Sequence, residues 1–225
     1  MTRIVDVARL QLMDGRKAVG LPLGIMATVL ALNVAIAFIA SSGDLSTGGV
    51  SAIYVVVAIG QIQVITQFFP FALGLGVTRK EFYAAALLYA LVQAMAFGLV
   101  LAAGLAIERA TGGWGVGLGF FRFGAPENLL LAWLVFAAVL LGCSAVGLGF
   151  GVVFKRWGQL GVYAVLIGLA VVLVGAMAVI GWQGWWPQVF SALGDQPPAA
   201  AVVYPLLLAL LVGGAGWLGL RRATP

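Results

Sequence analysis

Long apolar segments without any charged residue dominate this chain. Six such segments cover residues 18–43, 45–78, 82–107, 128–154, 157–194 and 196–220. Each is longer than the roughly 20 residues that an α-helix needs to cross the hydrocarbon core of a bilayer. The pattern predicts an all-α membrane protein with six transmembrane helices, at about 19–40, 51–73, 84–107, 128–154, 159–181 and 200–220.

The first 17 residues form a charged leader before the first apolar segment. In a helix, Ile4, Ala8 and Leu12 would share an apolar face, while Arg9 and Arg16 would lie elsewhere. Such an amphipathic helix lies in the plane of the membrane interface. The alternative is a basic tail that only fixes the topology. Because the leader is long and charged, we do not expect the first predicted span to be a removable signal peptide.

Composition argues against a soluble domain. Of the 225 residues, 63% are hydrophobic and only 8% are charged, whereas soluble domains carry about 25% charged residues. The leader and the loops between the predicted helices are short. We therefore expect a single transmembrane domain over residues 1–225.

The basic residues fall mainly on one side of the predicted membrane. Of the 12 basic residues, only Arg109 and Arg122 fall on the opposite side. Cytoplasmic loops carry an excess of Lys and Arg, so this bias predicts that both termini are cytoplasmic. The net charge of +5 then reflects topology, and we expect no nucleic-acid partner. The remaining basic residues are Arg3, Arg9, Arg16, Lys17, Arg79, Lys80, Lys155, Arg156, Arg221 and Arg222.

The chain lacks the residues that most catalytic and metal sites need. It has no His and a single Cys, Cys143, which argues against a His-based triad, an intrachain disulfide and a thiolate metal cluster. None of the 7 acidic residues lies near the middle of a predicted span, where ion relays place carboxylates. No phosphate-binding loop occurs. We expect no catalytic residue, no metal site and no ATP site on this chain.

Four polar side chains stand out within the predicted spans: Asn33, Gln63, Gln67 and Gln93. Gln63 and Gln67 are four residues apart and share one helical face. Such groups either form hydrogen bonds between helices or line a substrate pathway. Both interpretations require these side chains to face protein or water rather than lipid, and the sequence leaves the choice open.

Small and aromatic residues mark two further features near the C-terminal end. Gly161, Gly168 and Gly175 recur every seven residues, so they form one bare stripe against which another helix can pack. The alternative role for this stripe is a wall of a substrate groove.

Three tryptophans predict a short helix or re-entrant turn on the outer face of the membrane, because Trp is enriched at membrane interfaces. They are Trp182, Trp185 and Trp186.

Residues 76–83 hold the only charge cluster between positions 45 and 107. Together with the preceding residues from Phe69, this stretch resembles a signature, roughly aLGvtRrefy, of bacterial ABC transporter permeases of the type-2 exporter class. In that family the stretch links spans 2 and 3 on the cytoplasmic side. The cluster comprises Gly76, Val77, Thr78, Arg79, Lys80, Glu81, Phe82 and Tyr83.

The resemblance implies that residues 76–83 are a coupling helix that docks into a separate ATP-binding subunit. Arg79, Lys80 and Glu81 would make polar contacts there, and Phe82 and Tyr83 would anchor the segment to the membrane domain. The partners would be two ATPase copies, which bind ATP and Mg, and a second permease chain, either identical or a paralogue. Spans 2 and 5 would line the pathway between the protomers.

The expected function is therefore that of a permease subunit in the bacterial cytoplasmic membrane, surrounded by lipid. The largely apolar pathway favours a hydrophobic or amphipathic cargo, such as a lipid, drug or peptide antibiotic. An excess of Arg over Lys is typical of GC-rich bacteria. The alternatives are a substrate-binding membrane subunit of a vitamin importer and a non-transporting membrane scaffold or immunity protein.

Overall fold

The computed structural model describes Val7 and residues 16–40, 45–122 and 124–221. Most of the predicted leader helix, residues 1–17, lies outside the described residues. Of that leader, Val7 is helical and is buried in an apolar cluster with residues such as Ile65, Phe82 and Leu148.

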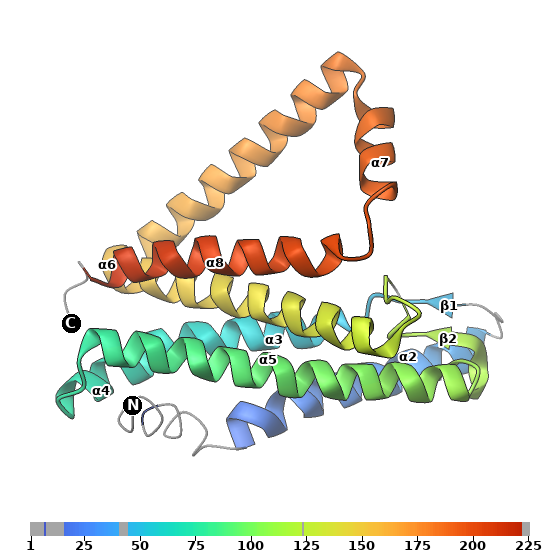
Figure 1. Ribbon diagram of the computed structural model, residues 1–225, viewed down its shortest axis with the longest axis horizontal. Helices are drawn as coiled ribbons and strands as arrows, with labels where there is room; N and C mark the ends of the chain where they lie inside the picture. The colour runs from blue at the N-terminus through green and yellow to red at the C-terminus, as the bar shows by residue number, and fades with distance from the viewer. Residues whose placement is uncertain (1–6, 8–15, 41–44, 123, 222–225) are drawn as a thin grey trace.

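The described chain is built almost entirely from helices (Figure 1). Segments labelled η are single π-helical turns. The helical elements are η1 Arg16–Gly20, α2 Leu21–Ala40, α3 Ser51–Gln63, η2 Val64–Phe68, α4 Phe69–Gly74, α5 Arg79–Ala110, η3 Gly113–Gly117, α6 Leu129–Gln183, α7 Trp186–Gly194 and α8 Ala200–Leu220. Two short strands, β1 Leu45–Ser46 and β2 Leu118–Gly119, complete the fold.

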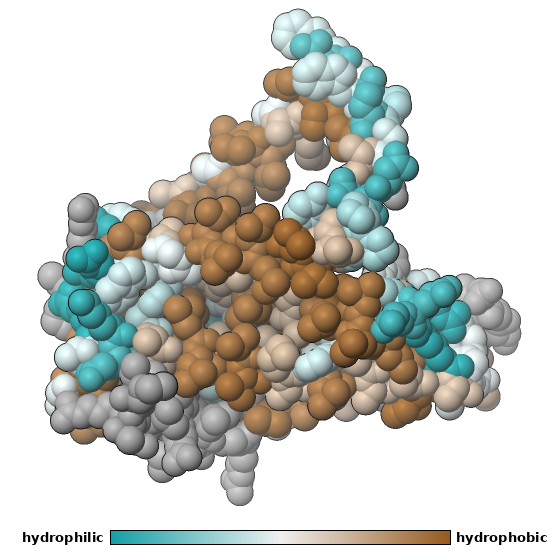
Figure 2. Space-filling view, viewed as in Figure 1, coloured by the Kyte–Doolittle hydropathy of each residue, from teal (hydrophilic) through white to brown (hydrophobic). Residues whose placement is uncertain are grey.

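The helices have the length and surface of a membrane protein. Among the described residues, five helical segments are long and apolar enough to cross a membrane. Apolar side chains cover the middle of the molecule in Figure 2, and hydrophilic residues gather toward its ends and around α7. The expectation of an all-α, multi-pass membrane protein is confirmed at this level.

Span 2 continues through Pro70 rather than ending there. α3, η2 and α4 form one continuous helical segment, and Pro70 lies in the first turn of α4. Proline has no backbone N–H to donate to the preceding turn. That turn is the wider π-turn η2, in which the Thr66 hydroxyl donates to the Ile62 carbonyl at 3.0 Å. The proline therefore coincides with a local widening of the helix, not with its end.

Predicted spans 4 and 5, at about 128–154 and 159–181, do not pack along each other in the structure. The two spans join in α6, in which Gly158 alone has non-helical backbone angles, φ 65° and ψ −157°. The chain reverses at Gly158, and the two parts then diverge (Figure 1). We call residues 129–157 the packed half of α6 and residues 159–183 the outlying half. α8 runs along the packed half, as contacts from Gly142, Gly149 and Gly219 show.

Small residues bring the packed helices together. A Cβ added at Gly147 would lie 2.2 Å from the Ala58 carbonyl oxygen of α3, and one at Gly98 would lie 3.0 Å from Ala137. Such close approach is how helices associate within membranes, where lipid removes the hydrophobic driving force between them. The core of the bundle therefore lies among α2, α3, α5, the packed half of α6 and α8.

The loop after α5 contains a short strand that pairs with a strand in the loop after α2. β2 pairs in parallel with β1, with Leu45 opposite Leu118 and Ser46 opposite Gly119. The loop after α2 is thereby joined to the loop after α5. We call the end of the bundle that carries these strands the loop end; it lies at the right of Figure 1.

Candidate functional site

The charged segment begins with a tight turn that closes α4. Gly76 has a positive φ of 79°, a conformation that glycine adopts without steric penalty. Its N–H donates to the Leu73 carbonyl at 3.0 Å, and the Val77 N–H donates to the Ala72 carbonyl at 3.1 Å. This pair of bonds is a Schellman motif, which satisfies carbonyls at a helix end. The chain direction at Gly76 is thus fixed by local hydrogen bonds.

α5 begins directly after this turn with a capping box. The Thr78 hydroxyl accepts from the Glu81 N–H at 3.3 Å, and the Glu81 carboxylate accepts from the Thr78 N–H at 2.9 Å. Such reciprocal bonds satisfy N–H groups that a helix start leaves without partners. Of the predicted coupling helix, residues 76–78 form the turn and the helix cap, and residues 79–83 are the first residues of α5.

Phe82 and Tyr83 lie in the core immediately after the charged positions. Phe82 is 1% exposed and its ring lies 5.2 Å from that of Phe69. Tyr83 packs against Trp217 of α8, and its hydroxyl donates to the Gly213 carbonyl. The start of α5 is therefore held by α4 on one side and by α8 on the other.

The charged side chains of this segment lie at the end of the bundle opposite the loop end. Lys80 is exposed, and Arg79 is partly buried and donates to the Arg221 carbonyl at 3.2 Å. We call this end, which also carries Lys155 and Arg156 at the reversal of α6, the basic end; it lies at the left of Figure 1. Because the backbone below Lys80 is capped and anchored, a force applied to this surface would be transmitted to α5.

A polar cluster lies inside the bundle, and Gln93 is its centre. The Gln61 side-chain amide donates to Gln93 Oε1 at 2.9 Å, and the Gln93 amide donates to the Tyr89 hydroxyl at 3.1 Å and to the Ala18 carbonyl at 3.3 Å. Gln61 is 1% exposed, and its Oε1 has no partner among the described residues.

The other polar residues singled out in the spans lie elsewhere. Gln63 and Gln67 are exposed on the outside of the helical segment that Ser51–Gly74 forms. The Asn33 amide donates to the Val29 carbonyl of its own helix at 2.8 Å. The structure thus joins none of these three to Gln93 by a hydrogen bond. Sequence reasoning missed Gln61, although the lone polar group of span 3 required a polar partner on a facing helix.

The glycine stripe of the outlying half has almost no neighbours. No atom lies within 4 Å of a Cβ built at Gly168 or Gly175, and Gly161 is close only to Trp157 and Val153 at the reversal of α6. Every residue from 163 to 179 is exposed. Within the described chain, the close helix packing expected at this stripe does not occur, and the stripe remains accessible to another molecule.

The three tryptophans lie at the far end of the outlying half. Trp182 is 92% exposed, Trp185 precedes α7, and Trp186 stacks on Phe190 at 5.8 Å within it. Of the two predicted forms, short helix or re-entrant turn, α7 is a short helix. It leads from the tip of the outlying half back to α8 (Figure 1).

A buried carboxylate organises the loop end, and sequence reasoning did not single it out. Glu108 is fully buried and accepts from the backbone N–H groups of Phe120, Phe121 and Arg122 at 2.8, 2.8 and 3.1 Å. The Trp114 indole donates to the same carboxylate at 3.2 Å. A carboxylate is tolerated in such a place only when its oxygens are hydrogen-bonded. An acid at a helix end followed by a glycine-rich loop was the available signal.

Within the described residues, no cluster of three or more His, Cys, Asp or Glu side chains could hold a metal ion.

Comparison with other proteins adds no family assignment. Searches of protein-family models, curated proteins and solved structures found no match to this chain.

Proposed function

We propose that this chain is the transmembrane permease subunit of an ATP-driven exporter in the bacterial cytoplasmic membrane. A separate ATP-binding subunit, present in two copies, supplies the energy. In this proposal the two halves of α6 cross the membrane separately and raise the number of spans to six. Both termini and the basic end face the cytoplasm, in keeping with the positive-inside rule.

One observation carries the proposal: exposed charge lies directly beside a buried anchor at the start of α5. Lys80 is exposed at the basic end, and Phe82, two residues later, is 1% exposed. A soluble partner that grips the surface at Arg79 and Lys80 can therefore move a helix of 32 residues as one body. Energy released outside the membrane would reach the membrane part along this route.

The outlying half supports the presence of a second permease chain. Its residues 163–179 are exposed along their whole length, and its glycine stripe offers close approach to another helix. The exposed face of span 2, with Gln63 and Gln67, is also unused within the chain. These two surfaces would line the pathway between two copies or paralogues. Both surfaces are largely apolar and carry no charged residue, which favours a hydrophobic or amphipathic cargo, such as a lipid, drug or peptide antibiotic.

The test is co-purification with an ATP-binding cassette protein encoded beside this gene. We expect Arg79→Glu/Lys80→Glu to abolish complex formation and the stimulation of ATP hydrolysis. Lys155→Glu/Arg156→Glu is the matched control, because it reverses the same number of charges at the same end of the bundle but outside residues 76–83. A double variant that assembles and stimulates like the native chain would reject the coupling role.

A further inference from the structure

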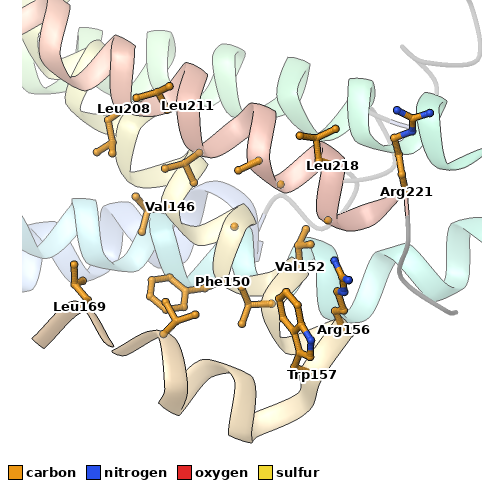
Figure 3. Close-up of a pocket in the computed structure, with 17 residues that line it drawn as sticks. Val146, Phe150, Val152, Arg156, Trp157, Leu169, Leu208, Leu211, Leu218 and Arg221 are labelled. Atoms are coloured by element: carbon orange, nitrogen blue, oxygen red, sulfur yellow. The ribbon is translucent and has the colours of Figure 1, made fainter. Parts of the chain in front are cut away.

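A large apolar cavity lies at the reversal of α6. It has a volume of about 1090 Å³ and is bounded by both halves of α6 and by α8. Its walls are aliphatic and aromatic, with Phe150 from the packed half, Leu169 from the outlying half and Leu208 and Leu211 from α8 (Figure 3). We call it the elbow cavity. Its volume is slightly above the range of roughly 300–1,000 Å³ typical of small-molecule sites.

Two arginine residues line one end of the elbow cavity. Of the 17 described residues that line it, only Arg156 and Arg221 are charged, and no acidic residue is among them. Figure 3 shows both at the same end as Trp157, away from Leu169 and Leu208. The Arg156 guanidinium lies 4.4 Å above the Trp157 ring, a contact that favours one orientation of the arginine. The cavity is therefore apolar over most of its length and cationic at the basic end.

We propose that the elbow cavity binds an anionic phospholipid from the leaflet at the basic end. The acyl chains lie along the aliphatic walls that the two halves of α6 and helix α8 provide. The phosphate lies between Arg156 and Arg221, whose planar guanidinium groups suit phosphate oxygens. This lipid site does not depend on the exporter proposal, because it requires only that the protein lies in a membrane.

Charge complementarity favours this occupant over a second copy of the chain. The most exposed apolar segment of the protein is the outlying half, and residues 159–183 contain no acidic residue. That helix inserted into the cavity of another copy would leave the two guanidinium groups without a counter-charge. A lipid phosphate supplies the charge, and the acyl chains fill the apolar part.

Trp157 provides a direct probe of the site. The protein is reconstituted in phosphatidylcholine vesicles that contain either brominated phosphatidylglycerol or brominated phosphatidylcholine, whose bromine atoms quench nearby tryptophan. The Trp157 signal is the difference between the native chain and Trp157→Phe. Each arginine near an anionic lipid surface favours binding about 5-fold, so we expect phosphatidylglycerol to be preferred by about 25-fold.

Two variants separate the site from general attraction to the surface. We expect Arg156→Gln/Arg221→Gln to remove the preference for phosphatidylglycerol. Lys155→Gln should retain it, because Lys155 is next to Arg156 in the chain but does not line the cavity. Ala215→Phe places a ring in the cavity from an exposed position of α8 and leaves both arginines in place. We expect it to reduce the preference to less than about 2-fold, because the acyl chains lose their space.

Three results would overturn the proposal. A preference that survives the double arginine variant would mean that other charges attract the lipid. A preference that Ala215→Phe leaves intact would mean that the headgroup binds outside the cavity. Absence of quenching by either lipid would mean that lipid does not enter the cavity, the result expected if a second copy of the chain occupies it.

Discussion

Glycines in the two halves of α6 have opposite surroundings. In the packed half, Gly147 approaches the Ala58 carbonyl and Gly151 approaches Ile65 of η2. In the outlying half, no atom lies within 4 Å of a Cβ built at Gly168 or Gly175. Both halves are apolar and rich in small residues, so composition alone does not decide which helix acquires a neighbour. A complementary surface on a facing helix decides it, and only the packed half has one within the chain.

The largest loss of stability is expected from a substitution at the loop end, where the helices are packed. Glu108→Ala removes the acceptor of three backbone N–H groups and of the Trp114 indole. Buried donors without partners cost about 1–3 kcal/mol each, so we expect a loss of about 3 kcal/mol or more. Thermal unfolding of the purified protein measures the loss, and hydrogen exchange at Phe120 and Phe121 reports the opening of the loop.

Glu127→Ala is the control for that prediction. Glu127 is exposed, and only its backbone carbonyl, which the substitution retains, accepts from Arg109. We expect less than about 0.5 kcal/mol of change, as for most surface substitutions. Equal destabilisation by the two variants would contradict the role of Glu108 as the anchor of the loop.

Alanine substitutions at the glycines should have opposite signs in the two halves. Gly147→Ala brings a methyl group against the α3 backbone, and overpacking costs about 1–3 kcal/mol. Gly168→Ala meets no atom and gains up to about 1 kcal/mol of helix propensity. The midpoint of thermal unfolding should fall for the first variant and hold or rise for the second. A decrease of the same size in both would show that the halves are equally packed.

A smaller effect is expected at the polar cluster. Gln93→Leu leaves the buried Gln61 amide without its partner, which costs about 1–3 kcal/mol when a polar group is left unsatisfied. Gln67→Leu, at an exposed position of η2, removes a side-chain amide that faces outward and serves as the control. Thermal unfolding of both in the same detergent gives the comparison. Destabilisation by Gln67→Leu alone would place the important polar contact on the outside of the bundle.

The smallest effect is expected from a single hydroxyl between α5 and α8. Tyr83→Phe removes the hydrogen bond to the Gly213 carbonyl and should cost about 0.5–1.5 kcal/mol. Tyr163→Phe makes the same chemical change in the outlying half, where Tyr163 is 57% exposed, and should be neutral. The same unfolding assay measures both, and a larger loss at Tyr163 would reverse the assignment of packed and outlying regions.

The sequence predicted the helical spans well, because uncharged apolar runs of sufficient length have few other uses. It did not predict that the outlying half would leave the bundle, since a packed hairpin and an open reversal have the same hydropathy. The spacing of Gln63 and Gln67 drew attention to these two side chains, which are exposed. The glutamine of this helix that is buried and bonds to Gln93 is Gln61. Helical spacing groups residues on a face but does not say which face is buried when the whole helix is apolar.

For Glu108 the sequence offered a signal, an acid at a helix end before a glycine-rich loop, but it did not identify the groups that donate to the carboxylate. Its donors come from residues 114–122, and they reach one carboxylate only because the loop folds back onto the end of α5. The start of α5, in contrast, is encoded locally. Thr78 and Glu81 are three residues apart, the spacing of a capping box.

Gly158 is required for its backbone conformation and not for the space around it. No atom lies within 4 Å of a Cβ built at this position, so by volume alone any side chain would fit. Its backbone angles, φ 65° and ψ −157°, fall in a region that is essentially restricted to glycine. In a scan of all single substitutions, position 158 should therefore tolerate no replacement despite its open surroundings. The direction of the last third of the protein is thus constrained by the backbone angles of one residue, and not by side-chain packing around it.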